Sequence, residues 1–156
     1  MRDQKNDYPD WEDYYMNIAL QVAERSTCIR RQVGCVITRE NYILTTGYNG
    51  ALPGHPECLD LGCLRDQLNI ESGTMKHVCR AMHAEQNAIA AAARNGISLK
   101  DGTCYVTLYP CVNCAKAIVM AGIKKVVVKS MGKSNAAKEY FEQSNIIVHV
   151  MDYDED

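Results

Sequence analysis

The sequence lacks long apolar segments and lacks an excess of positive charge. No run of apolar residues approaches the roughly 18 that a membrane-spanning helix needs, and residues 1–15 contain no apolar stretch of signal-peptide type. We therefore expect a cytoplasmic protein with no membrane partner. The 17 Lys and Arg residues are balanced by 19 Asp and Glu, which gives a formal net charge of −2. Nucleic acid is consequently not expected as a partner, because proteins that bind it carry a basic surface.

The chain also lacks internal repeats and low-complexity linkers. Its 156 residues lie within the usual size of one domain, and a chain of this length buries roughly 70% of the surface that its unfolded form exposes. Residues 1–156 are therefore predicted to form a single domain. Cysteine, by contrast, is abundant, with eight residues. In a reducing compartment, clustered cysteines indicate metal binding or catalysis more than disulfides.

Helical and strand patterns alternate along the chain. Helices are predicted at 11–25, 83–96, 111–122 and 135–144, and strands at 33–38, 42–48, 103–109, 124–130 and 146–150. Asp10 is the expected N-cap of the first helix. The apolar face of that helix is assigned to Tyr14, Tyr15, Ile18, Leu20 and Val22. The alternation predicts an α/β fold with three layers, α-β-α, around a mixed five-stranded sheet.

Residues 49–81 form the longest stretch without a regular pattern. We predict a long loop with a short helix near 63–69. A loop of this length in a compact domain is usually functional, or is held in place by something. Two of the cysteines outside this stretch, Cys35 and Cys104, lie in apolar strands and are expected in the core.

The residues that carry chemistry gather in two segments, "CRAMHAEQNAI" at 79–89 and "PCVNC" at 110–114. Cys111 and Cys114 are three residues apart at the start of a predicted helix, which puts both sulfurs on one face and favours thiolates. His83 begins another predicted helix. Three such ligands on a tetrahedral zinc leave one position for water, as in catalytic zinc sites.

Each half of this pattern alone has an ordinary explanation. A Cys-x-x-Cys pair in a cytosolic protein is a redox or structural zinc motif at least as often as a catalytic one, and an isolated His-x-Glu means little. The combination H-x-E with P-C-x-x-C, in this order, is the signature of zinc-dependent nucleobase deaminases. It predicts a zinc ion that lowers the pKa of a bound water from about 15.7 to about 7, with Glu85 as the group that moves its protons.

"HAEQNAI" together with "PCVNCAKAIVMAGIKKVV" resembles the zinc-dependent cytidine/deoxycytidylate deaminase superfamily. "RSTCIRRQVGCVI" and "TTGYNGALPG" narrow the resemblance to the deoxycytidylate (dCMP) deaminases, over residues 11–150. The resemblance implies a cytidine-deaminase-like fold and the hydrolysis of dCMP to dUMP and ammonia, which feeds thymidylate synthesis. By position, it implies that His83, Cys111 and Cys114 bind zinc. Glu85 would protonate N3 of the pyrimidine and later the departing ammonia.

The resemblance also assigns residues to the substrate. It implies that Asn49 holds the deoxyribose and that the backbone at Ala84 contacts the base. A nucleotide also needs a phosphate site, for which "STCIRR" offers Ser26 and Arg30, because an Arg fork suits a phosphate. Tyr109, directly before a proline, either lines the base pocket or is an ordinary strand tyrosine.

The remaining cysteines are candidates for a second, structural zinc. The resemblance implies that Cys28 and Cys58 bind such an ion in some members of the family. We expect Cys79 as the third ligand and Cys63 or His77 as the fourth, since a metal would hold a loop that has little core of its own. Reduced thiols in a loop are the alternative.

Family members are commonly homohexamers that dCTP activates, together with Mg²⁺, and that dTTP inhibits. Arg94 takes a position that some members use at a subunit interface linked to this control. Two other functions remain open: another deaminase of the superfamily, acting on a different nucleotide or nucleoside or on adenosine in tRNA, and a catalytically silent zinc protein that binds nucleotides. "GYNG" and the acidic net charge argue against tRNA, and Glu85 argues against a silent protein. The sequence does not distinguish dCMP from CMP or from a modified cytosine nucleotide.

Overall fold

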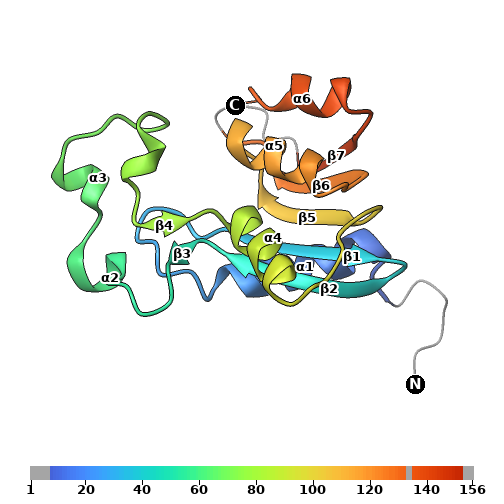
Figure 1. Cartoon of the computed structure of the whole chain (residues 1–156), viewed down its shortest axis with the longest axis horizontal. Helices are drawn as coiled ribbons and strands as arrows, with labels where there is room; N and C mark the ends of the chain where they lie inside the picture. The colour runs from blue at the N-terminus through green and yellow to red at the C-terminus, as the bar shows by residue number, and fades with distance from the viewer. Residues whose placement is uncertain (1–7, 133–134, 153–156) are drawn as a thin grey trace.

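The computed structural model describes residues 8–132 and 135–152 (Figure 1). Its elements, in chain order, are α1 Trp11–Ala23, β1 Gly34–Arg39, β2 Tyr42–Tyr48, β3 Gly50–Ala51, α2 Cys58–Leu61, α3 Leu64–Gln67, the 3-10 helix η1 Lys76–Val78, β4 Ala81–Met82, α4 Ala84–Arg94, β5 Thr103–Leu108, α5 Val112–Met120, β6 Lys125–Ser130, α6 Lys138–Gln143 and β7 Ile147–Asp152. No helix in this described part is both long and apolar enough to cross a membrane.

Five strands form one mixed sheet in the order β2-β1-β5-β6-β7. β1 is antiparallel to β2 and to β5, whereas β5, β6 and β7 are parallel to one another. The parallel half follows from the helices α5 and α6, because parallel neighbours need a crossover connection. α1 covers one face of the sheet, and α4, α5 and α6 cover the other (Figure 1). The predicted three-layer α/β fold is confirmed.

Strand residues alternate between two separate cores, as the two-residue period of a strand requires. In β1, Cys35 and Ile37 face α4 and its neighbours, while Val36 faces α1. Cys104 belongs to the same core as Cys35, so both cysteines are buried as expected. The face of the sheet that carries α4 and α5 therefore has a densely packed core. The first turns of these two helices lie at the edge of that core.

Helix α1 begins as predicted but presents a different face. Asp10 is its N-cap, with Oδ1 accepting a hydrogen bond of 2.8 Å from the backbone N–H of Asp13. Tyr14 and Leu20, which we had assigned to the buried face, are 44% and 40% exposed. The buried residues are instead Tyr15, Met16, Ala19 and Ala23. Their spacing follows the helical period, and small alanines allow the closest approach to the sheet.

Two glycines allow helices to lie directly against strands. A Cβ atom on Gly34 would lie 2.0 Å from the carbonyl oxygen of Ala19 in α1. A Cβ atom on Gly47 would lie 2.3 Å from the carbonyl oxygen of Ala84 in α4. Neither space admits a side chain. The glycine that opens "GYNG" therefore has a physical role, because it sets how closely the start of α4 approaches β2.

Residues 52–80, which we call the loop lobe, project from one end of the sheet (Figure 1). The short antiparallel strands β3 and β4 close the neck of the lobe, with Gly50 opposite Met82 and Ala51 opposite Ala81. The short helix predicted near 63–69 is present as α3, but α2, η1 and the neck were not predicted. Inside the lobe, Arg65 Nη2 donates hydrogen bonds to the carbonyl oxygens of Glu71 and Thr74, at 2.7 and 2.8 Å.

Candidate functional site

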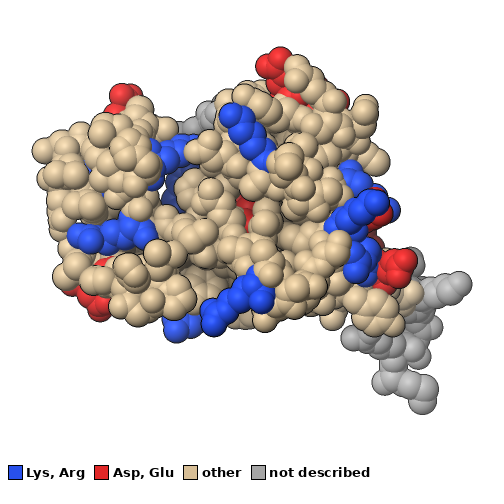
Figure 2. Space-filling view, in the orientation of Figure 1, with Lys and Arg blue, Asp and Glu red and all other residues tan. Residues whose placement is uncertain are grey.

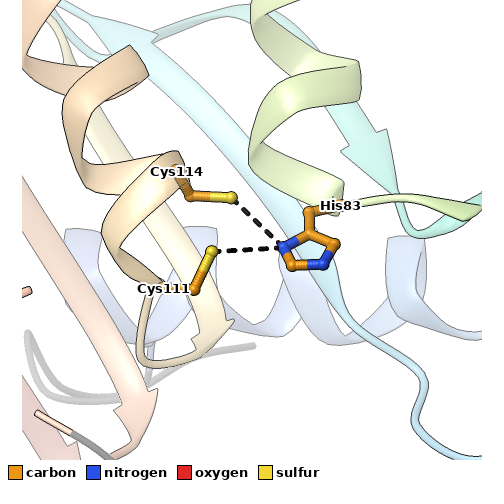
Figure 3. A group of neighbouring side chains, drawn as sticks. All are labelled: His83, Cys111 and Cys114. Atoms are coloured by element: carbon orange, nitrogen blue, oxygen red, sulfur yellow. Dashed lines mark hydrogen bonds between the residues drawn. The ribbon is translucent and has the colours of Figure 1, made fainter. Parts of the chain in front are cut away.

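His83, Cys111 and Cys114 meet where α4 and α5 begin (Figure 3). His83 is the N-cap of α4, Cys111 is the N-cap of α5, and Cys114 lies in the first turn of α5. His83 Nδ1 is 3.5 Å from Cys111 Sγ and 3.4 Å from Cys114 Sγ. The three ligand atoms lie within 4.8 Å of one another, and no second group of this kind occurs among the His, Cys, Asp and Glu side chains of the described residues.

The geometry of this group fits a zinc ion. Tetrahedral zinc with ordinary bond lengths to nitrogen and sulfur holds those two atoms about 3.6 Å apart. The nitrogen–sulfur distances of 3.4 and 3.5 Å are close to that value. One nitrogen and two sulfurs also match the donor set of a catalytic zinc that keeps a fourth position open. We therefore regard these three residues as able to hold zinc without rearrangement.

The two thiols influence each other strongly. The hydrogen bond from the Cys114 thiol, followed by the contact with His83, lowers the pKa of Cys111 to about 3. The same contact and burial raise the pKa of Cys114 far above its ordinary value, because a second thiolate would form beside the first. The hydrogen bond with Cys111 also raises the pKa of His83. A divalent cation removes this conflict, since it stabilises both thiolates at once.

Glu85 lies in the first turn of α4 and is only 4% exposed. Burial raises the pKa of its carboxyl group above the ordinary value of 4.5. A carboxyl group of raised pKa exchanges protons more readily near neutral pH than an exposed one, which suits a general acid and base. Glu85 lies two residues after the ligand His83, at the start of the same helix.

A cleft of about 880 Å³ leads to this group, between the loop lobe and the sheet. Figure 2 shows the hollow on this face, with Lys and Arg side chains around it. The volume is within the range that accommodates nucleotide-sized ligands. Of the residues predicted to contact substrate, Arg30, Asn49, Ala84 and Tyr109 line the cleft together with His83, Glu85 and Cys111.

The other predicted contacts lie elsewhere. Ser26 is buried behind Asn49, and its hydroxyl oxygen is 2.7 Å from Asn49 Oδ1. Arg94 is exposed at the far end of α4, away from the cleft. Arg30 forms an ion pair of 3.5 Å with Asp66 of the loop lobe. The contacts that these residues make with substrate or effector remain predictions.

Glu71 and Lys76 of the loop lobe also line the cleft, together with Arg30 and Arg31, and neither lobe residue was predicted from the sequence. The length of the irregular stretch 49–81 indicated a functional loop, but it did not show which residues of the loop face the metal group. The turns of a loop determine which of its residues come close to one another. The sequence separation of loop residues therefore says little about which side chains meet.

Cys58, Cys63 and Cys79 of the loop lobe line the cleft, and so does Cys28, which lies outside the lobe. Burial, and then the proximity of the other three thiols, raises the pKa of Cys58. His77 is exposed and is not among the lining residues of the cleft. The four thiols are therefore neighbours, although the described residues hold them less tightly together than the His83 group.

Residues 9–130 match the family model for the cytidine and deoxycytidylate deaminase zinc-binding region, and the chain belongs to this family. The chain is 38% identical over 146 residues to ComE operon protein 2 of Bacillus subtilis, covering 93% of this chain and 73% of that protein. It is 40% identical over 119 residues to the deoxycytidylate deaminase of Saccharomyces cerevisiae, covering 76% of this chain but only 37% of the yeast protein.

A solved structure supports the same relationship. The dCMP deaminase of cyanophage S-TIM5, in complex with dCMP and dUMP, superimposes with a TM-score of 0.77 at 28% sequence identity. The similarity covers 92% of this chain and 98% of the cyanophage chain. The cytidine-deaminase-like fold expected from the sequence is thereby confirmed.

Proposed function

We propose that this protein is a zinc-dependent deaminase that hydrolyses dCMP to dUMP and ammonia, and so supplies dUMP for thymidylate synthesis. The observation that carries the proposal is the meeting of His83 Nδ1 with the two sulfurs of Cys111 and Cys114, with the buried Glu85 two residues after His83. Two relatives support the substrate: the yeast protein is named deoxycytidylate deaminase, and the cyanophage enzyme was solved with dCMP and dUMP.

In this reaction, the bond between C4 of the pyrimidine and the amino nitrogen is replaced by a bond between C4 and oxygen. His83, Cys111 and Cys114 would hold zinc, which would lower the pKa of a water bound to it. Glu85 would take a proton from the attacking water and deliver it to N3 of the base. The oxygen bonds to C4, Glu85 passes the second proton to the amino group, and the C4–N bond breaks to release ammonia.

The phosphate of dCMP is assigned to the positively charged side of the cleft. Arg30, Arg31 and Lys76 line it, and Glu71 is the one acidic lobe residue among the described lining residues. The ion pair between Arg30 and Asp66 is at the surface and contributes little stability, so a phosphate can replace Asp66 as the partner. Arg30 and the phosphate would then form the stronger, forked interaction.

The test of this proposal is ammonia release from dCMP, CMP, deoxycytidine, cytidine and an adenosine-containing tRNA hairpin, with a Glu85→Gln variant as the blank. We expect dCMP to be turned over well above the nucleosides. Turnover of nucleosides or tRNA alone would retain the zinc chemistry and contradict the substrate. A zinc-loaded protein that acts on none of the five would instead be the silent nucleotide-binding protein.

Cys28, Cys58, Cys63 and Cys79 are proposed to hold a second, structural zinc. All four line the cleft, and the other three thiols contribute to the raised pKa of Cys58. Both observations support this site, and they favour Cys63 over the exposed His77 as the fourth ligand. Metal analysis should then give two zinc ions per chain. A Cys58→Ser variant should lose one of them and keep activity on dCMP at reduced stability, whereas a single zinc in the unmodified chain would contradict the second site.

Control and assembly are proposed from the family resemblance alone. We expect a homohexamer in the cytoplasm, where the eight free cysteines stay reduced. We also expect activation by dCTP with Mg²⁺ and inhibition by dTTP, with the exposed Arg94 at a subunit contact. Light scattering and initial rates, each with and without these nucleotides, measure both properties.

A further inference from the structure

Ser26 and Asn49 form a buried polar pair beneath one wall of the cleft. Their side chains belong to residues that are 7% and 8% exposed. Ser26 Oγ lies 2.7 Å from Asn49 Oδ1 and 2.7 Å from the backbone oxygen of Asn49, so its single hydrogen is donated to this residue. In return Ser26 Oγ accepts a hydrogen bond of 3.2 Å from the backbone N–H of Cys28.

Asn49 extends the same network to the other end of this wall. Its Oδ1 accepts a hydrogen bond of 2.8 Å from the backbone N–H of Val33, and its Nδ2 donates one of 2.8 Å to the carbonyl oxygen of Arg31. The backbone N–H of Asn49 donates to the carbonyl oxygen of Val33 at 3.2 Å. Hydrogen bonds of Ser26 and Asn49 therefore hold the segment 26–33 in place at both of its ends and in its middle.

Residues 26–33 have no helix or strand of their own, since α1 ends at Ala23 and β1 begins at Gly34. Backbone groups in such a segment need partners from elsewhere, and a buried group left without one costs about 1–3 kcal/mol. The Ser26–Asn49 pair supplies those partners. The segment that it holds carries Arg30 and Arg31, whose side chains line the cleft.

We infer that Ser26 and the side chain of Asn49 are positioning residues, which hold residues 26–33 so that Arg30 and Arg31 face the anionic end of the substrate. The inference rests on the proposed function, because the anionic group is then the phosphate of dCMP. Ser26 acts through the backbone and does not touch the nucleotide. The pair therefore sets the preference for a nucleotide over a nucleoside, while the metal group carries out the chemistry.

The kinetic test is a Ser26→Ala variant, assayed with dCMP and with deoxycytidine. We expect KM for dCMP to rise about three- to tenfold, the effect of one lost buried hydrogen bond. We expect kcat for dCMP to stay unchanged, and kcat/KM to fall much less for deoxycytidine than for dCMP, because deoxycytidine has no phosphate for Arg30 and Arg31. A Tyr15→Phe variant is the matched control, because it removes a hydroxyl that donates to the carbonyl oxygen of Asn41 at 2.6 Å, in the core on the opposite face of the sheet.

An equal loss with both substrates would show a general structural role, and no change would show no role. Either result overturns the inference. A second measurement does not depend on turnover: hydrogen exchange at the amides of Cys28 and Val33 should accelerate in Ser26→Ala and not in Tyr15→Phe, with Val36 in β1 as an internal reference. Unchanged exchange at these amides would also overturn it. Failure of the unmodified protein to deaminate dCMP would contradict the proposed function, and the exchange result would still decide on the pair.

Discussion

Single residues decide whether the metal group works, and each has a distinct task. Cys114 is fully buried and is the least accessible of the three ligands. A Cys114→Ala variant should lose one zinc per chain and all measurable turnover, because a histidine and one thiolate hold zinc too weakly. Metal analysis after gel filtration measures this. Cys104→Ala is the control, since Cys104 is equally buried but lies in the core outside the group.

Glu85 should be needed for turnover and dispensable for the metal. A Glu85→Gln variant keeps the shape of the side chain but cannot accept a proton, so we expect a fall in kcat of at least about a hundredfold with the zinc content unchanged. Parallel metal analysis and ammonia assays separate the two effects. Loss of zinc in this variant would mean that the carboxyl supports the metal instead of the proton transfers.

The elements are positioned by close backbone approaches as much as by side-chain packing. A Gly47→Ala variant should displace the start of α4, because its new Cβ would lie 2.3 Å from the carbonyl oxygen of Ala84. We expect a stability loss of about 1–3 kcal/mol and a clear loss of turnover, since Ala84 lies between His83 and Glu85. Thermal unfolding and activity measure the two. Thr46→Ala, one residue away and exposed, should change neither.

The helices and strands of the main sheet could be predicted from the sequence because their apolar periods are long and regular. The metal ligands could be predicted because His83, Cys111 and Cys114 stand in a motif whose spacing has a direct chemical meaning. The buried pair of Ser26 and Asn49 could not, because the hydroxyl of Ser26 meets the side chain and the backbone oxygen of a residue 23 positions away, which only the folded chain brings close.

Other features depended on the tertiary structure in the same way. Tyr14 was wrongly assigned to the core, since α1 turns its alanines toward the sheet. The neck formed by β3 and β4 is only two residues wide on each side, too short for any periodic signal. The pairing of Arg30 with Asp66 required knowledge of how the lobe folds back.

At the scale of the whole molecule, Glu12 joins α1 to the parallel half of the sheet. Its Oε1 lies 2.5 Å from Lys125 Nζ in β6, and its other oxygen pairs with His149 Nδ1 in β7. Burial alone would raise the pKa of Glu12, but hydrogen bonds from Lys125 and His149 outweigh it and lower the pKa below the ordinary 4.5. The carboxylate therefore favours the folded state only while it is ionised.

The sign of the pH dependence follows from this lowered pKa. The contribution of Glu12 to stability is present above its ordinary pKa of 4.5 and is lost as the pH falls through the lower value in the folded state. The difference in unfolding free energy between the unmodified protein and Glu12→Gln, below about 1 kcal/mol for such a partly exposed group, should therefore shrink on acidification. Denaturant titrations at several pH values measure it. Acid release of zinc affects both proteins and cancels, and a difference that stays constant with pH would contradict the assignment.

The neck of the loop lobe has a consequence for how such an enzyme can diversify. Residues 52–80 leave and rejoin the frame at neighbouring points, through the pairs Gly50–Met82 and Ala51–Ala81. Their content can thus be exchanged without altering the path from β2 to α4. The residues proposed to carry out the reaction lie at the starts of α4 and α5, outside the loop lobe. One wall of the cleft, by contrast, is formed by the loop lobe, which can be exchanged. New lobes grafted at this junction would change which molecules are admitted and leave the deaminating chemistry in place.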